Sequence, residues 1–124
     1  MDVTRVVDAP PAAVWEQFAS TRNWPAWGPS VRAVDPADDV VRPGLRGHVT
    51  TAVGVRLPFE VTEVVPGRSW SWRVAGVPAT GHSVEVVAGR TVATITIPAW
   101  APFYAPVCRT GLRRIAERAE RAER

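Results

Sequence analysis

Between residues 46 and 97 the chain is a series of short segments in which apolar and polar residues alternate, each ended by a turn signal. Strand side chains point to opposite faces in turn, so this period of two predicts strands. The expected strands are 46–53, 55–65, 69–74, 82–87 and 91–97, with connections at 66–67, 76–81 and 88–89. A strand spacing of roughly ten residues predicts an antiparallel meander and argues against βαβ units.

One strand and two short helical segments are expected before the meander. Residues 2–8 alternate and predict the first strand. Pro10 and Pro11 suit the first turn of a helix, whose apolar face follows at helical spacing through residue 18. The segment 24–29 (Trp-Pro-Ala-Trp-Gly-Pro) cannot extend that helix, and it predicts a turn or a second helical fragment before a short strand at 31–34.

The end of the chain predicts a long helix over residues 102–122. Apolar or small residues recur there at intervals of three and four, which is the spacing of one buried helix face. This stripe consists of Tyr104, Cys108, Gly111, Ile115 and Ala119. The other face is rich in Arg and Glu, and two i,i+4 pairs, Glu117 with Arg121 and Glu120 with Arg124, predict a solvated surface.

The composition of the 124 residues is that of one globular domain spanning 1–124, with 46% apolar and 22% charged residues. No apolar run approaches the roughly 20 residues that cross a membrane, and the first residues do not resemble a signal peptide, so we expect a cytoplasmic protein. All fifteen basic residues are Arg, which excludes Schiff-base chemistry on lysine. A net charge of +3 without a recognition motif does not predict nucleic-acid binding. With two His and one Cys, no metal site and no cofactor are expected.

The order of these elements resembles that of the START-like, helix-grip superfamily, also called SRPBCC. Within it the chain is most similar to the bacterial polyketide cyclase/dehydrase and lipid-transport group. The segments that carry the resemblance are 8–15 (Asp-Ala-Pro-Pro-Ala-Ala-Val-Trp), 24–27 (Trp-Pro-Ala-Trp), 43–44 (Pro-Gly), 61–68 (Val-Thr-Glu-Val-Val-Pro-Gly-Arg), 71–72 (Ser-Trp), 81–86 (Gly-His-Ser-Val-Glu-Val) and 111–115 (Gly-Leu-Arg-Arg-Ile).

The resemblance implies an α+β fold in which a curved antiparallel sheet of six or seven strands wraps around a long C-terminal helix, with two short helices after the first strand. It also implies a cavity between sheet and helix. Members include polyketide aromatase/cyclases, lipid and steroid carriers, hormone receptors and co-chaperones, so the fold does not define one function. The chain has no long insert before its final helix, in contrast to larger members.

We expect an apolar cavity of a few hundred Å³ between sheet and final helix. Its predicted lining is Trp72, Val74, His82, Val84, Ile95, Tyr104 and Cys108. His82 shares a strand face with Val84 and Val86, which marks this face as inward. His82 is therefore either a general acid/base or a hydrogen-bonded core histidine, with equal weight. Tyr104 either donates a hydrogen bond to a ligand or packs, and Cys108 is more consistent with a buried inert thiol than with a nucleophile.

Charged strand residues have two interpretations each. Glu63 would share an inward face with Val61 in a regular strand, as a pocket acid with a raised pKa; a bulge that turns it outward is the favoured alternative. Arg56 and Arg73 are either anchors for an anionic ligand or solvated side chains. The tryptophans Trp15, Trp24 and Trp27 are expected to pack in the core more than to line the pocket.

Three functions are compatible with the sequence. The first is binding of an apolar small molecule with cofactor-independent polyketide cyclase/dehydratase-like chemistry, in which the pocket orients the substrate and His82 moves a proton. The second is a non-catalytic carrier of lipids or apolar metabolites, and the third is a module that binds a protein partner. Convergence of His82, Tyr104, Arg73 and Glu63 on one space would favour the enzyme, and an isolated His82 among apolar walls would favour the carrier.

Overall fold

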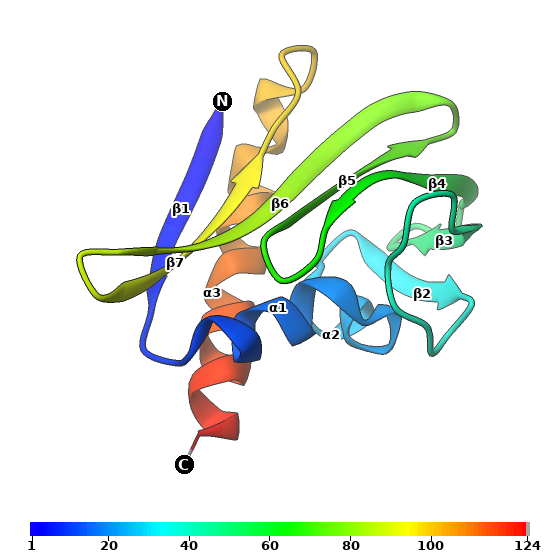
Figure 1. The fold of residues 1–124 in the computed structure, drawn as a ribbon. Coiled ribbons are helices and arrows are strands. Elements are labelled where there is room, and N and C mark those ends of the chain that lie inside the picture. Colours follow the sequence, from blue (N-terminus) through cyan, green and yellow to red (C-terminus); the bar gives the residue numbers. More distant parts are fainter. Residues whose placement is uncertain (124) are drawn as a thin grey trace.

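The computed structural model describes residues 1–123 as a seven-stranded antiparallel sheet with its helices on one face, as expected for the α+β helix-grip class (Figure 1). The spatial order of the strands is β1-β7-β6-β5-β4-β3-β2. The strands are β1 (Asp2–Val7), β2 (Val31–Asp35), β3 (Arg46–Thr51), β4 (Arg56–Val65), β5 (Ser69–Val74), β6 (Val77–Val87) and β7 (Arg90–Thr96). The helices are α1 (Pro11–Ala19), α2 (Trp24–Trp27) and α3 (Ala105–Ala122), with 3₁₀ turns at Thr21–Asn23 and Pro102–Tyr104.

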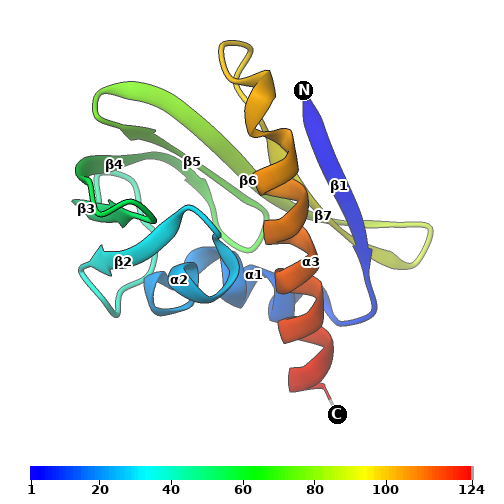
Figure 2. The same cartoon turned by 180° about the vertical axis from the view of Figure 1, so that it is seen from behind.

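Helix α3 crosses the sheet over β1 and β7, and α1 and α2 lie beside it (Figure 2). Its buried side is the predicted small-residue stripe, extended by Ala105, Leu112 and Ala116. Arg118 departs from the predicted solvated face, because its guanidinium donates to the side-chain oxygens of buried Gln17 (2.7 Å) and Asn23 (3.2 Å). The predicted Glu120–Arg124 pair lies outside the described residues. No helix within residues 1–123 is both long and apolar enough to span a bilayer.

Strand β6 is longer than the sequence predicts, because residues 77–81 continue the strand instead of forming a connection. The turn before it is only Ala75 and Gly76, both with positive φ, which is the backbone of a two-residue hairpin turn. Pro78 is tolerated because β7 pairs with β6 only from Gly81 onward, so the first part of β6 has a free edge. The carbonyl of Pro78 points to that edge and accepts the indole N–H of Trp100 at 3.0 Å.

Two irregularities in the sheet redirect side chains. The β4–β5 register shifts between Val61 and Glu63, so Val61 is fully buried while Glu63, two residues later, is exposed. This confirms the favoured bulge at Glu63. The β5–β6 register shifts between Ser71 and Arg73, which places Ala79 and Thr80 together opposite Trp72. Thr80 is buried as a result.

Three tryptophan indoles cap the C-terminal end of α1. The last carbonyls of a helix have no intrahelical partner, so a buried helix end needs other donors. The indole N–H groups of Trp24 (2.9 Å) and Trp70 (3.0 Å) both donate to the carbonyl of Phe18, and that of Trp27 donates to the carbonyl of Gln17 (2.8 Å). The core-packing interpretation of Trp24 and Trp27 is thus confirmed, and both also line a cavity described below.

Gly47 on β3 provides a test of the packing between β2, β3 and β4, with Gly81 on β6 as a matched control. A Cβ on Gly47 would overlap the carbonyl oxygen of Asp35 and lie 2.9 Å from the ring of Phe59, whereas a Cβ on Gly81 would make an ordinary 3.4 Å contact with Thr96. We expect Gly47→Ala to lower the free energy of unfolding by about 1–3 kcal/mol or more. The matched Gly81→Ala should change it by less than about 1 kcal/mol, because alanine suits a strand better than glycine. Urea denaturation of both variants checks this, and equal stabilities would contradict it.

Candidate ligand-binding site

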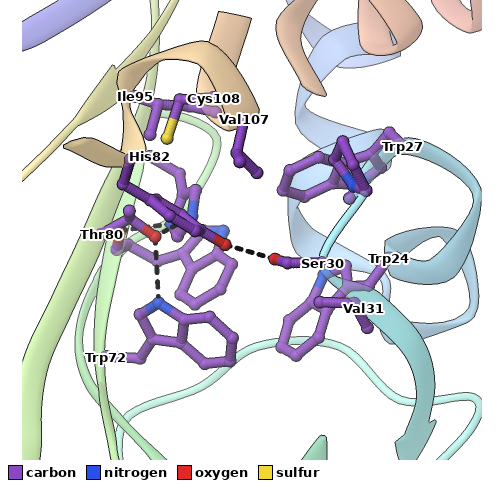
Figure 3. Close-up of a pocket in the computed structure, with 14 residues that line it drawn as sticks. Trp24, Trp27, Ser30, Val31, Trp72, Thr80, His82, Ile95, Val107 and Cys108 are labelled. Atoms are coloured by element: carbon purple, nitrogen blue, oxygen red, sulfur yellow. Dashed lines mark hydrogen bonds between the residues drawn. The ribbon is translucent and has the colours of Figure 1, made fainter. Parts of the chain in front are cut away.

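A chamber of about 50 Å³ lies between the sheet, α2 and the start of α3. Figure 3 shows Trp24, Trp27 and Ser30 on one side of it, facing Trp72, Thr80 and His82 from the sheet. The full lining is Trp24, Trp27, Gly28, Pro29, Ser30, Val31, Trp70, Trp72, Thr80, His82, Ile95, Tyr104, Val107 and Cys108. The chamber has the expected position and is much smaller than expected, because tryptophan rings fill most of that space.

An open apolar groove of about 330 Å³ adjoins the chamber. Its lining is Ser30, Val31, Val49, Thr51, Leu57, Trp72, Val74, Ala79, Thr80, Pro98, Trp100, Ala101, Phe103 and Tyr104. The sheet supplies one wall, and the segment between β7 and α3 supplies the other. Trp100 (58% exposed) and Phe103 (73% exposed) stand at its rim. The groove has the volume of a small-molecule site, whereas the chamber alone does not.

Five residues line both spaces and form the partition between them: Ser30, Val31, Trp72, Thr80 and Tyr104. Two hydrogen bonds hold this partition. The hydroxyls of Ser30 and Tyr104 bond to each other between the α2–β2 loop and the start of α3. On the sheet side, the indole N–H of Trp72 donates to Thr80 Oγ1 at 3.2 Å (Figure 3).

His82 is 4% exposed and fully hydrogen-bonded. Its Nδ1 lies 3.3 Å from the carbonyl oxygen of Trp70, which can only accept, so Nδ1 carries the hydrogen. The neutral ring then accepts at Nε2, and the Thr80 hydroxyl donates to it at 2.9 Å. The ring also stacks on Trp70 with a centroid distance of 4.0 Å. The network assigns the neutral Nδ1–H tautomer and occupies both ring nitrogens.

The environment favours the neutral form of every ionisable group in the lining. Burial lowers the pKa of His82 from 6.5 to about 3, and the bond to the Trp70 carbonyl opposes only part of this shift. Burial raises the pKa of the Cys108 thiol to about 11, which agrees with an inert thiol. Burial also raises the pKa of Tyr104, and its hydrogen bond with Ser30 opposes this shift. The site therefore has a low effective polarity.

The structure brings most of the predicted site residues together and separates the others. Trp72, His82, Ile95, Tyr104 and Cys108 line the chamber, and Val74 lines the groove. Val84 is buried in the core and lines neither space. Arg73 and Glu63 are exposed outside both spaces, beside a separate open hollow of about 440 Å³ that His82 also borders. The bulge turns Glu63 outward, and Arg73 alternates with the inward Trp72 and Val74. Arg56 is exposed beside Asp35, at 3.4 Å.

Several residues of the site were not predicted. Ser30 lies in an irregular loop, where no period points to a role. Thr80 lies in the segment expected to be a connection, so its inward direction depended on the unpredicted bulge. Leu57 and Val49 are directly paired across β3 and β4, and the alternating pattern of those strands could have indicated their shared face.

The fold and the groove define a START-like helix-grip domain, with a ligand-sized space between the sheet and the C-terminal helix. The family model described as "Polyketide cyclase / dehydrase and lipid transport" matches residues 1–120, and the chain belongs to this family. No curated protein matches the chain.

Several solved bacterial structures have a similar fold. The Aha1 dimer from Colwellia psychrerythraea matches with a TM-score of 0.74 and 16% identity, over 97% of this chain and 95% of that one. Protein CV1439 from Chromobacterium violaceum matches with a TM-score of 0.68 and 21% identity, over 97% of this chain and 96% of that one. Protein Ms6760 from Mycobacterium smegmatis matches with a TM-score of 0.63 and 22% identity, over 94% of this chain and 87% of that one. At these identities the similarity shows the fold alone.

The pKa of His82 predicts a specific dependence of stability on pH. Between pH 6.5 and about 3 the unfolded chain protonates His82 and the folded chain does not. The free energy of unfolding should therefore fall as the pH falls through this window, by up to about 1.4 kcal/mol per pH unit, with no contribution from His82 above it.

Urea denaturation of the wild-type protein and of His82→Gln at pH 7, 6, 5 and 4 measures this effect, because the other titrating groups are common to both. We expect the stability of the wild-type protein, relative to the variant, to decline with falling pH. A difference that stays constant over the four pH values would show that His82 titrates near its ordinary pKa.

Proposed function

We propose that this protein binds an apolar small molecule in the groove between its sheet and the β7–α3 segment, as a carrier or receptor that performs no chemistry of its own. The observation that carries the proposal is the open groove of about 330 Å³, whose walls are almost entirely aliphatic and aromatic. An apolar ligand would displace water from these walls, at about 25 cal/mol per Å² of apolar surface buried.

The rim supports ligand entry from solvent. Trp100 and Phe103 are large apolar side chains that are more than half exposed, and both also line the groove. Exposed aromatic side chains at the edge of a cavity often mark a binding surface. Here they extend the apolar wall outward, so a ligand longer than the groove would still be covered at its outer end.

Cyclase-like chemistry has less support from the geometry. Proton transfer to a substrate needs a base with a free lone pair within hydrogen-bonding reach. The Nε2 lone pair of His82 already accepts a hydrogen bond from Thr80, and the low pKa makes the ring a poor base. Arg73 and Glu63 line neither the chamber nor the groove, so no charged side chain accompanies His82 there. The two charged residues and His82 border a separate, wide-open hollow of about 440 Å³, where Arg73 and Glu63 both carry exposed side chains. A role in which His82 holds Thr80 and Trp70 in place is more consistent with these contacts.

A module that only binds protein partners is also less well supported. Such a domain would not need an open internal groove, and the exposed Trp100 and Phe103 are part of the groove wall instead of a separate surface patch. The indole N–H of Trp100 donates to the carbonyl of Pro78 on β6, and this hydrogen bond holds the ring at the groove.

Tryptophan fluorescence provides a direct test, because Trp72 and Trp100 both line the groove. We expect titration with phenanthrene or decanol to shift or quench the emission with saturation. Leu57→Glu, which places a carboxylate in the groove wall, should weaken binding at least about tenfold, since burying an unpaired charge is costly.

The matched control is Val65→Glu, on the same strand but exposed and away from the groove. This variant should bind like the wild-type protein. Equal binding by Leu57→Glu and Val65→Glu would place the ligand elsewhere. A wild-type emission that no apolar ligand alters would contradict the proposed function itself.

A further inference from the structure

We infer, resting on the proposed function, that the hydroxyl pair of Ser30 and Tyr104 is the head-group site of the groove, and that it selects an uncharged ligand carrying a hydrogen-bond acceptor such as a ketone. The pair lies on the partition, so it closes the inner end of the groove and faces whatever occupies it. Three observations support this assignment. The other strong hydrogen-bond donors near the groove already have acceptors in the protein, the lining carries no charged side chain, and the pair lies at the inner end of the groove.

The other strong donors of the partition and its surroundings are already used. Each of the five lining indoles donates to an oxygen of the protein: Trp24 and Trp70 to Phe18, Trp27 to Gln17, Trp72 to Thr80, and Trp100 to Pro78. His82 donates to Trp70, and the Thr80 hydroxyl donates to His82. None of these groups can donate to a ligand without losing a bond of its own.

The Ser30–Tyr104 pair differs from them. Two hydroxyls carry two hydrogens, and their mutual bond uses one, so one hydrogen remains for a ligand. Thr51 also has a hydroxyl in the groove lining, where its oxygen accepts the backbone N–H of Val55 at the outer β3–β4 turn. The Cys108 thiol is only a weak donor. The pair is thus the donor available at the inner end of the groove, where Ser30 and Tyr104 are both partly buried.

Charge is absent from the same walls. Among the described residues that line the chamber and the groove there is no Arg, Asp or Glu. An anionic head group would lose its hydration without gaining a counter-charge, which is costly. A hydrocarbon would bind without using the free hydroxyl hydrogen. A neutral acceptor is the chemistry that this site matches.

Three ligands of nearly equal shape separate these cases: 2-acetylnaphthalene, 2-isopropylnaphthalene and 2-naphthoate, each titrated by calorimetry at pH 7. For the wild-type protein we expect the ketone to bind about two- to tenfold more tightly than the hydrocarbon, the range that one hydrogen bond provides. The carboxylate should bind at least about tenfold more weakly than the ketone.

Because either hydroxyl can supply the free hydrogen, both must be removed to abolish the preference for the ketone. Tyr104→Phe and Ser30→Ala each leave one hydroxyl with a free hydrogen, so each should retain the preference for the ketone. The double variant Ser30→Ala/Tyr104→Phe has no such hydrogen and should bind the ketone and the hydrocarbon equally. Thr51→Val is the matched control, which removes a groove hydroxyl outside the partition and should leave the preference unchanged.

The outcomes separate this inference from the proposed function. Hydrocarbon binding by the double variant shows that it is folded and that its groove is intact. Equal wild-type affinities for ketone and hydrocarbon, a preference that survives in the double variant, or tightest binding of the carboxylate would each overturn the head-group assignment while leaving apolar binding in place. Binding of none of the three ligands by the wild-type protein would overturn both.

Discussion

The end of α1 is the point on which the surrounding structure depends. This helix ends in the core, where unpaired carbonyls would cost about 1–3 kcal/mol each. Two indoles supply donors to the carbonyl of Phe18: Trp24 from α2 and Trp70 from β5. Capping this one helix end therefore fixes the position of α2 and of the centre of the sheet at the same time.

Two of the capping rings, Trp24 and Trp70, also form a stack with His82. Trp24 lies parallel to Trp70 (centroids 5.2 Å apart, 8° between the ring planes), and His82 also stacks on Trp70 (4.0 Å, 24°). Aromatic contacts of this kind contribute about 0.5–1.5 kcal/mol each beyond their buried area. The stack joins α2, β5 and β6, and it keeps His82 neutral by excluding water. Both ring nitrogens of His82 are hydrogen-bonded in that position.

The same packing explains why the larger apolar space lies where it does. In this domain the region between the sheet and the start of α3 is filled by Trp24, Trp27, Trp70 and Trp72, which leaves only about 50 Å³. The larger space lies further out, under the short segment between β7 and α3. Three prolines in that region, at 98, 102 and 106, restrict its backbone, and the Trp100–Pro78 bond holds it to the sheet. A wall of the groove is thus preorganised without a long lid.

Local patterns in the sequence determined the helices and strands and, for most of them, which side chains point toward the core. Period-two alternation defined the strands, the three-and-four spacing from Cys108 to Ala119 defined α3, and the paired Trp70 and Trp72 defined an inward face. These features are local because a side chain's direction follows from its neighbours along the chain.

Tertiary structure decided what depends on contacts between distant segments. The bulges turned Glu63 outward and Thr80 inward, the loop containing Ser30 met Tyr104 some seventy residues later, and burial moved the pKa of His82 far below its ordinary value. Such effects depend on register, loop position and solvent exclusion, which no segment specifies by itself.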